Sequence, residues 1–357
     1  MPYFAGVDAH KNTHAVVFLD SVGKVVQVLK ISADAAGYEQ SLAYARSLNA
    51  EIFWGLESTG CYAGAFARVL IASGAVVYEV PGSFTKRHRQ RSSRTGKSDA
   101  LDAQAIAEAV LRESERLPRF ERSEEREALR LRYDQRDRLV HQRTEAINRL
   151  RSAALRLDHG ELPAELLSAP GINAIHDIIS RAQASTDFVV QALVDDMRFA
   201  VEDIGRISER IKAIEALLRP IVRRVAPELL ALRGVSTIVA AGLIGHGGNL
   251  RNCRNADAFA MRAGTAPVEC SSGRNSAVRV NRGGSRQLNR LLHVIALVQL
   301  SKSDHAGRLY YDRKRAEGKT SRAALRALKR KLTVVVYYRL IAAAQRFTPS
   351  LSQRSAA

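Results

Sequence analysis

Short apolar runs, each bounded by Gly, Asp or Pro, alternate with polar turns over the first quarter of the chain. Runs of this length and composition predict β-strands. Helical patterns separate the last three runs. Three strands in succession, followed by alternating helix and strand, predict an α/β domain built on a mixed sheet. The predicted strands are Tyr3–Asp8, His14–Leu19, Val25–Ile31, Ile52–Glu57 and Val76–Val80, and the predicted helices are Tyr38–Leu48 and Ala63–Ser73.

A further helical pattern begins after Ser98. Apolar residues recur there with helical period, and Ser98 stands where an N-cap is expected. Asp99 and Asp102 lie in the first turn at a spacing of i, i+3, so both carboxylates lie on one face of the helix. Such a pair either belongs to a site or complements the positive end of the helix dipole.

The middle third is rich in Glu, Arg, Leu and Ala, which indicates long helices. An apolar stripe over residues 133–157 is interrupted by two arginines. A second stripe, over residues 193–221, is uninterrupted and has the repeat of a coiled coil. The two helices form an antiparallel hairpin or each pairs with a second protomer. Turns are predicted at residues 159–163 and 169–171.

The last third contains a Gly-Val turn followed by a helix of small residues, at Leu232–Ile244, which resembles a helix-hairpin-helix element. Backbone N–H groups at such a turn can approach a phosphate. The whole pattern predicts four regions. They are an α/β domain over 1–112, a helical coiled-coil region over 113–230, a mainly helical domain over 231–345 and a tail over 346–357.

The formal net charge of +19 points to a polyanionic partner, either nucleic acid or an anionic membrane surface. No apolar run reaches the roughly eighteen residues that a membrane span needs, and the N-terminus lacks the pattern of a signal peptide. Nucleic acid is therefore the expected partner. The three cysteines are far apart, form no zinc-ligand pattern and fit a reducing cytoplasm.

Four acids are candidates for a metal site. Asp8 and Glu57 stand where two predicted strands end, which is where α/β folds place their chemistry. Together with Asp99 and Asp102 they would repel one another without a cation, and oxygen ligands favour Mg²⁺ or Mn²⁺ over zinc. Two such ions about 4 Å apart can activate an attacking oxygen and stabilise a leaving one in phosphoryl transfer. The alternative is a set of exposed acids at strand ends.

Two basic segments are candidates for contacts with a phosphate backbone. The first precedes the acidic helix and contains no acid; its basic residues are Lys86, Arg87, Arg89, Arg91, Arg94 and Lys97. The second spans residues 262–331, where 17 Lys and Arg stand against 4 Asp and Glu. The candidates in it are Arg274, Arg279, Arg282, Arg286 and Arg290. A solvated loop is the alternative for the first segment.

The second basic segment also contains the run Cys270-Ser-Ser-Gly273. A serine hydroxyl is a poor nucleophile until it is deprotonated or bound to a metal. Nearby arginines can stabilise charge on a transferring phosphoryl group. From the residues alone, a flexible Ser-Gly loop is the alternative.

Three of these motifs resemble those of the one-ten family of insertion-sequence transposases. They are Gly6–Lys11, Gly55–Gly60 and Lys97–Asp102. The resemblance implies a RuvC-like domain of the RNase H type. It also implies that Asp8, Glu57, Asp99 and Asp102 bind the metal ions.

The segment around Cys270–Gly273 resembles the transposase domain of the same family, which carries a nucleophilic serine in a Ser-Gly context. The resemblance places that role on Ser272, with Ser271 as the second choice. It further implies a non-coding bridge RNA that pairs with donor and target DNA. The acids and the serine lie far apart in the sequence with long helices between them, so we expect them to meet across protomers of a dimer or tetramer. The expected location is the bacterial cytoplasm, with the nucleoid.

The resulting hypothesis is a DNA recombinase in which Ser272, assisted by Mg²⁺, forms a covalent phosphoserine intermediate. Two other hypotheses stay open on the residues alone. One is a RuvC-like Holliday-junction or structure-specific nuclease that uses metal-activated water, with a C-terminal region that only binds DNA. The other is a nucleic-acid-binding protein without catalysis, whose acids are structural.

Overall fold

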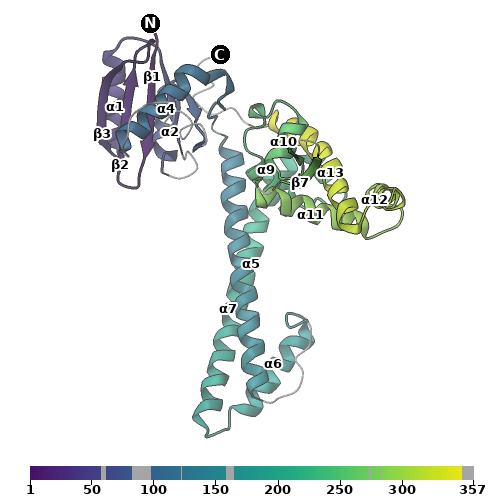
Figure 1. Cartoon of the computed structure of the whole chain (residues 1–357). Helices are drawn as coiled ribbons and strands as arrows, with labels where there is room; N and C mark the ends of the chain where they lie inside the picture. Colours follow the sequence, from purple (N-terminus) through teal and green to yellow (C-terminus); the bar gives the residue numbers. More distant parts are fainter. Residues whose placement is uncertain are drawn as a thin grey trace. The chain divides into compact units, whose positions relative to one another are not determined.

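The computed structural model describes residues 1–57, 62–82, 98–121, 123–157, 165–272, 275–281 and 283–347 (Figure 1). The chain folds into two compact units. The N-terminal unit holds Met1–Glu124 and Gly248–Phe259, and the helical unit holds Glu125–Gly247 and Ala260–Arg346. The four-region division of the sequence stays a prediction.

A five-stranded mixed sheet forms the centre of the N-terminal unit, with strand order β3-β2-β1-β4-β5. β1 pairs antiparallel with β2 and parallel with β4, while β3 is antiparallel to β2 and β5 is parallel to β4. The predicted strands and the predicted fold class are confirmed. The strands are β1 (Tyr3–Ala9), β2 (Thr13–Leu19), β3 (Val25–Ser32), β4 (Ile52–Leu56) and β5 (Val76–Glu79).

Both faces of this sheet are buried along β1, β2 and β4, whereas the edge strand β3 exposes alternate residues. Alternate residues of one strand, such as Val16 and Val17 of β2, belong to two different hydrophobic clusters. Helices α1 (Ala35–Ser47) and α2 (Gly64–Ala72) contribute to the first cluster, and α4 (Asp99–Glu113) contributes to the second. Burial on both faces explains why the strands read as nearly continuous apolar runs.

Two glycines bring α4 directly onto the sheet. Gly6 of β1 and Gly55 of β4 are paired across the parallel ladder. A Cβ at Gly6 would lie 2.0 Å from the carbonyl oxygen of Ala103, and one at Gly55 would lie 2.5 Å from Cγ2 of Val110. Only glycine allows the helix backbone to come this close to the strand. The glycine two residues before each strand-end acid is therefore a packing residue.

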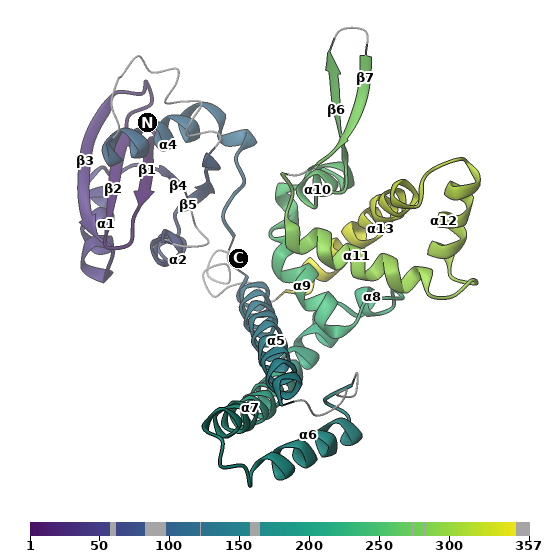
Figure 2. The same cartoon turned by 60° about the horizontal axis from the view of Figure 1, so that its bottom comes forward.

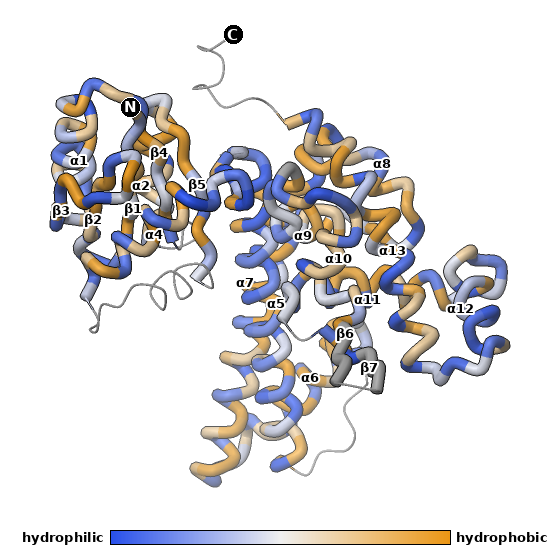
Figure 3. The backbone as a smooth tube through the Cα atoms, turned by 45° about the horizontal axis from the view of Figure 1, so that its top comes forward, coloured by the Kyte–Doolittle hydropathy of each residue, from blue (hydrophilic) through white to orange (hydrophobic). Residues whose placement is uncertain are grey.

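The helical unit begins with two long helices, α5 (Glu124–Arg156) and α7 (Phe188–Val225), which lie side by side in Figures 1 and 2. Hydrophobic and hydrophilic positions alternate along both of them (Figure 3). Their ion pairs are Glu125–Arg224, Arg136–Glu215 and Arg149–Asp203. Rising numbers on one helix meet falling numbers on the other, so the pair is antiparallel. The hairpin alternative is therefore confirmed within one chain.

The two arginines that interrupt the first stripe both bond across this hairpin. Arg136 Nε lies 2.8 Å from Glu215 Oε1, and Arg143 Nη1 donates to Ser208 Oγ at 3.5 Å. Their stems lie along the helix pair while their charged ends reach polar partners.

The turn predicted at residues 169–171 is wrong. Ala169, Pro170 and Gly171 open a helix, α6 (Ala169–Ala182), whose N-cap Ser168 accepts a hydrogen bond from Gly171 N at 3.2 Å. Proline is well tolerated in the first helical turn, where its missing N–H has no intrahelical partner. The Pro-Gly pair therefore marks a helix start.

Helices and one β-hairpin make up the remaining secondary structure of the described residues. Gly234, at φ +91°, lies against the backbone of α11 (Arg286–Leu300), so its close approach serves helix packing. A phosphate contact at this turn stays a prediction. None of the helices described is both long and apolar enough to cross a membrane. The remaining elements are η1 (Ser114–Arg116), α8 (Pro227–Leu230), α9 (Thr237–Gly247), η2 (Leu250–Asn252), α10 (Ala256–Arg262), β6 (Pro267–Ser272), β7 (Asn275–Val280), α11 (Arg286–Leu300), α12 (Ala306–Ala316) and α13 (Ser321–Ala344).

Candidate metal centre and serine hairpin

The first two candidate acids lie at one edge of the sheet. Asp8 is near the end of β1, and Glu57 follows β4 directly. Because β1 and β4 are parallel neighbours, both acids lie at the carboxyl ends of their strands. A Cβ at Gly82 would lie 2.8 Å from Glu57 Oε1, so the glycine after β5 leaves room for this carboxylate.

The other two acids lie in the first turn of α4. Ser98 accepts a hydrogen bond from Leu101 N at 3.3 Å and fixes where the helix begins. This confirms the predicted N-cap. It places Asp99 and Asp102 on the first turn, and the close packing of α4 on Gly6 holds that turn against β1.

His10 joins the two pairs of acids. Its Nε2 lies 3.3 Å from Asp8 Oδ2 and 3.2 Å from Asp99 Oδ1. One ligand atom from each of these three residues lies within 4.8 Å of the others, which is a spacing that suits one metal ion. The sequence analysis gave His10 no role. The Asp-x-His spacing is a weak signal, because the ring reaches the acids only through the turn in which His10 N donates to Thr13 O at 3.0 Å.

The pKa of Asp8 is affected by the other three candidate acids. Burial raises the pKa of its carboxyl, and the negative charges of Asp102, Asp99 and Glu57 raise it further, while His10 opposes them. Like charges held this close favour a bound cation, which relieves their repulsion. The donor set is therefore suited to a divalent ion, with three or four carboxylates and one imidazole available. Carboxylates favour Mg²⁺ and Mn²⁺, and imidazole suits later transition metals better than Mg²⁺.

The candidate nucleophile lies in the helical unit. Ser272 is the last residue of β6, where its backbone pairs with Asn275 of β7; Ser271 pairs with Ser276 (Figure 2). The sequence analysis expected a mainly helical domain here and did not predict this hairpin. The run has few β-branched residues and reads as a loop, because a two-stranded hairpin buries little apolar surface.

Of the residues predicted to contact nucleic acid, the structure describes Arg279, Arg286 and Arg290. Arg279 on β7 and Arg286 at the start of α11 are exposed. Arg290 is engaged within the protein: its Nη2 donates to the Tyr133 hydroxyl and to Asp137 Oδ1, both at 2.8 Å, and so links α11 to α5. The other predicted contacts lie outside the described residues; they are Lys86, Arg87, Arg89, Arg91, Arg94, Lys97, Arg274 and Arg282.

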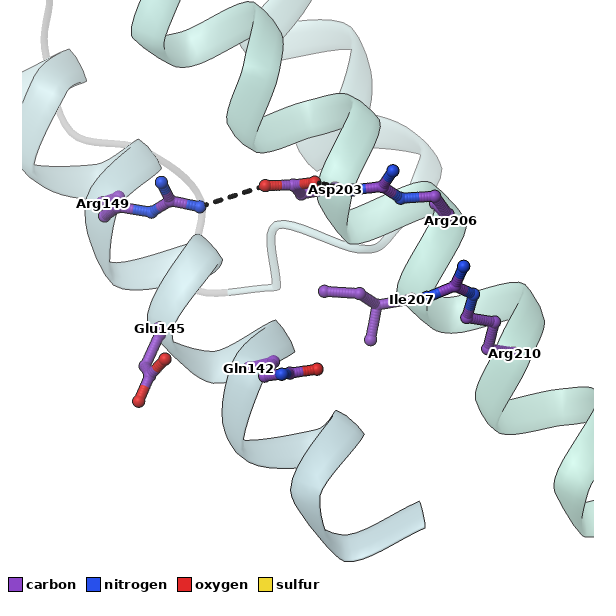
Figure 4. A pocket seen from close by; sticks show the side chains of 7 residues that line it. All are labelled: Gln142, Glu145, Arg149, Asp203, Arg206, Ile207 and Arg210. Carbon is purple, nitrogen blue, oxygen red and sulfur yellow. Dashed lines mark hydrogen bonds and ion pairs between the residues drawn. The ribbon is translucent and has the colours of Figure 1, made fainter. Parts of the chain in front are cut away.

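A polar pocket of about 560 Å³ lies between α5 and α7 (Figure 4). Arg149 and Arg206 both pair with Asp203 in it, at 3.2 and 2.5 Å. Its charges are thus largely satisfied within the protein, and we assign no ligand to it. Its lining residues are Gln142, Glu145, Arg149, Asp203, Arg206, Ile207 and Arg210.

Comparison with known proteins identifies the class of enzyme. Residues 5–157, which include the four acids, match a DEDD family model described as a transposase. The chain is therefore a transposase, an enzyme that transfers phosphoryl groups of DNA. Residues 226–312, which include the serine hairpin, match the transposase model of the IS116/IS110/IS902 family. The chain belongs to this family of insertion-sequence transposases.

Individual relatives agree with this assignment. The chain is 28% identical to an uncharacterized 42 kDa protein of insertion element IS900 from Mycobacterium paratuberculosis, over 94% of this chain and 95% of that protein. It is also 28% identical to the transposase of insertion sequence element IS1328 from Yersinia enterocolitica, over 60% of this chain and 63% of that protein. Among solved structures, Thermus thermophilus RuvC in complex with a Holliday junction matches 34% of this chain and 100% of its own, at 14% identity and a TM-score of 0.27.

Proposed function

We propose that this transposase cuts and rejoins DNA through Ser272, in a site completed by divalent cations held by Asp8, Glu57, Asp99 and Asp102. The observation that carries the metal half is the convergence of Asp8, His10 and Asp99, with the other two acids close enough to raise the pKa of Asp8. Mg²⁺ or Mn²⁺ bound there would stabilise charge on the attacking and leaving oxygens.

The serine step exchanges one phosphate ester for another. The Ser272 hydroxyl oxygen forms a bond to the scissile phosphorus, and the bond from phosphorus to the leaving sugar oxygen breaks. The proton that the serine loses is regained at that sugar oxygen. In the second step a hydroxyl of the new strand attacks the phosphoserine and releases the serine. The number of phosphate ester bonds is unchanged throughout, so rejoining needs no ATP.

The partners follow from the same proposal. Donor and target DNA are the substrates, and the resemblance to the family implies a bridge RNA that pairs with both. The strongly basic segment over residues 262–331 supports a large contact with nucleic acid. The acids belong to the N-terminal unit and the serine to the helical unit. We propose that a dimer or tetramer completes the site.

The decisive experiment is a denaturing gel of the protein after incubation with end-labelled DNA, the proposed bridge RNA and Mg²⁺. Wild-type protein is expected to give a protein–DNA adduct that survives denaturation. Ser272→Ala is expected to lose both the adduct and cleavage, while Ser271→Ala, its neighbour on β6, keeps them. Cleavage that persists in Ser272→Ala without an adduct would favour metal-activated water, as in a RuvC-like nuclease. Cleavage that needs neither Mg²⁺ nor Asp8 would remove the metal half.

A further inference from the structure

A second pocket, of about 520 Å³, lies at the base of the β6–β7 hairpin. Three parts of the helical unit form it: the entry and exit of the hairpin, the start of α11, and the first half of α13 together with Lys319, two residues before that helix. We call it the hairpin pocket. Its lining residues are Gly264, Thr265, Ala266, Pro267, Arg279, Val280, Asn281, Asn289, Lys319, Ala323, Arg326, Ala327, Lys329 and Arg330.

The charge in the hairpin pocket has one sign. Five of its lining residues are Lys or Arg, and none of the described residues that line it is Asp or Glu. This differs from the pocket between α5 and α7, where Asp203 pairs with two arginines. A pocket with several cations and no acid of its own attracts an anion from outside.

Helical spacing gathers three of these cations on α13. Arg326, Lys329 and Arg330 are separated by three and four residues, so they lie on one face of the helix. Ala323 and Ala327 share that face, and their small side chains leave the space that the pocket occupies.

Lys329 of the pocket is positioned by the side-chain amide of Asn289. The Asn289 Nδ2 group donates to the carbonyl oxygens of Ala263 and Gly264, at 3.1 and 3.0 Å. Its Oδ1 is therefore turned to Lys329, which donates to it. A neutral amide compensates a buried ammonium only in part. Burial accordingly lowers the pKa of Lys329.

Part of the lining is apolar. Pro267 and Val280 at the base of the hairpin, and Ala323 and Ala327 between the cations of α13, offer apolar surface. The amide of Asn281 is held in place, because its Oδ1 accepts from Gly283 N at 2.9 Å and its Nδ2 donates to Met261 O at 2.8 Å. Pockets of this size hold a ligand considerably larger than a phosphate. A phosphate with an attached base fits both parts of the lining, since the base needs an apolar surface with a few polar groups.

We propose that the hairpin pocket binds one unpaired nucleotide of a nucleic-acid strand, with its phosphate at the cations and its base against the apolar lining. The bound strand then runs along the hairpin: Ser272 is five residues from Pro267 on the same strand, which is about 17 Å at the usual rise. This second part rests on the proposed role of Ser272. The pocket itself does not.

Short oligonucleotides with one 2-aminopurine test the pocket, because this base fluoresces more strongly when it is unstacked. The full-length protein is titrated with single-stranded DNA, with RNA of the same sequence and with the duplex. The single strands are expected to bind with a rise in fluorescence. Arg326→Ala and Lys319→Ala are each expected to weaken this binding about tenfold and to flatten its salt dependence by about 0.7 of a unit of slope.

Arg223→Ala is the matched control. Arg223 is an exposed residue of α7 in the same helical unit, lies outside the basic segment over residues 262–331, and does not line the pocket. Its loss removes the same charge and is expected to change affinity less than twofold. Equal effects of Arg326→Ala and Arg223→Ala would show that the pocket contributes only general surface charge. Tighter binding of the duplex than of the single strands, without a fluorescence rise, would also overturn the proposal.

A labelling experiment separates the pocket from the serine. Bound oligonucleotide is expected to slow acylation of Lys329 by acetic anhydride at least fivefold in wild-type and in Ser272→Ala protein, as read by mass spectrometry. Unchanged acylation of Lys329 at saturating oligonucleotide would overturn the pocket. Protection without a covalent DNA adduct would leave the pocket standing and count only against the proposed role of Ser272.

Discussion

At the scale of single residues, the candidate metal centre depends on His10, whose Nε2 lies 3.3 Å from Asp8 Oδ2 and 3.2 Å from Asp99 Oδ1. Asp8 and Glu57 could be predicted because they end apolar strands, and strand ends of a parallel pair meet at one edge. Asp99 and Asp102 could be predicted because helical spacing places them on one face. His10 could not, because its ring reaches Asp8 and Asp99 only after the β1–β2 turn folds back.

Removing one of these ligands should remove metal binding. Asp8→Asn is expected to abolish saturable Mn²⁺ binding in calorimetry, and His10→Ala to weaken it about 10–100-fold. The matched control is Glu51→Gln, since Glu51 is an exposed acid at the opposite end of β4 from Glu57. Because the pKa of Asp8 is raised, protons compete with the metal at higher pH than at an ordinary aspartate, so affinity should fall early on acidification. Unchanged Mn²⁺ affinity in Asp8→Asn would contradict the site.

His14 should make the N-terminal unit sensitive to acid. Its side chain is fully buried against the rings of Tyr38 and Phe66, and burial lowers its pKa below the ordinary value of 6.5. Below pH 6.5 the unfolded chain therefore binds a proton that the folded chain resists, and stability falls with pH. Urea unfolding between pH 7.5 and 5 measures the loss. His14→Phe is expected to reduce this pH dependence, whereas His176→Gln, at an exposed position of α6, leaves it unchanged.

At the scale of elements, what the sequence predicts depends on how much apolar surface an element buries. The five strands and the two long helices were predicted because their buried faces leave a clear pattern. The direction of the α5–α7 pair was not, since a stripe reads the same for a hairpin and for a dimer; three ion pairs decide it. The β6–β7 hairpin and α6 were missed. A two-stranded hairpin leaves a weak sequence pattern because such a ribbon in general buries little apolar surface, and α6 begins with Ala169, Pro170 and Gly171, which read as a turn.

The contact between α4 and the sheet gives the sharpest test at this scale. Gly6→Ala would place a methyl group 2.0 Å from the carbonyl oxygen of Ala103, so either the helix or the strand must shift. We expect a loss of about 1–3 kcal/mol in the free energy of unfolding, together with weaker metal binding, because the first turn of α4 carries Asp99 and Asp102. Gly205→Ala in α7 is the matched control. It meets nothing within 4 Å and should stabilise its helix by about 0.5–1 kcal/mol. Equal stability of both variants would refute the packing argument.

At the scale of the whole molecule, the proposed mechanism requires acids in one unit and a serine in the other to act on one phosphate. The sequence placed the two groups in different regions, and the structure places them in different compact units. A chain built this way can complete its site from one protomer or from two. Both arrangements use the same residues of the same sequence, so the sequence does not distinguish them. Mixing two inactive variants separates these arrangements.

Asp8→Asn protein and Ser272→Ala protein are each expected to be inactive in recombination. In a mixed dimer with sites shared between protomers, one site receives the intact acids of one chain and the intact serine of the other. Random mixing should then restore about a quarter of the wild-type sites. If each site belongs to a single protomer, every site carries one defect and no activity returns. Strand-transfer assays on remixed protein measure this directly, with each variant remixed with itself as the control. Recovery near a quarter would establish a shared site, and the absence of any recovery would confine the chemistry to one protomer.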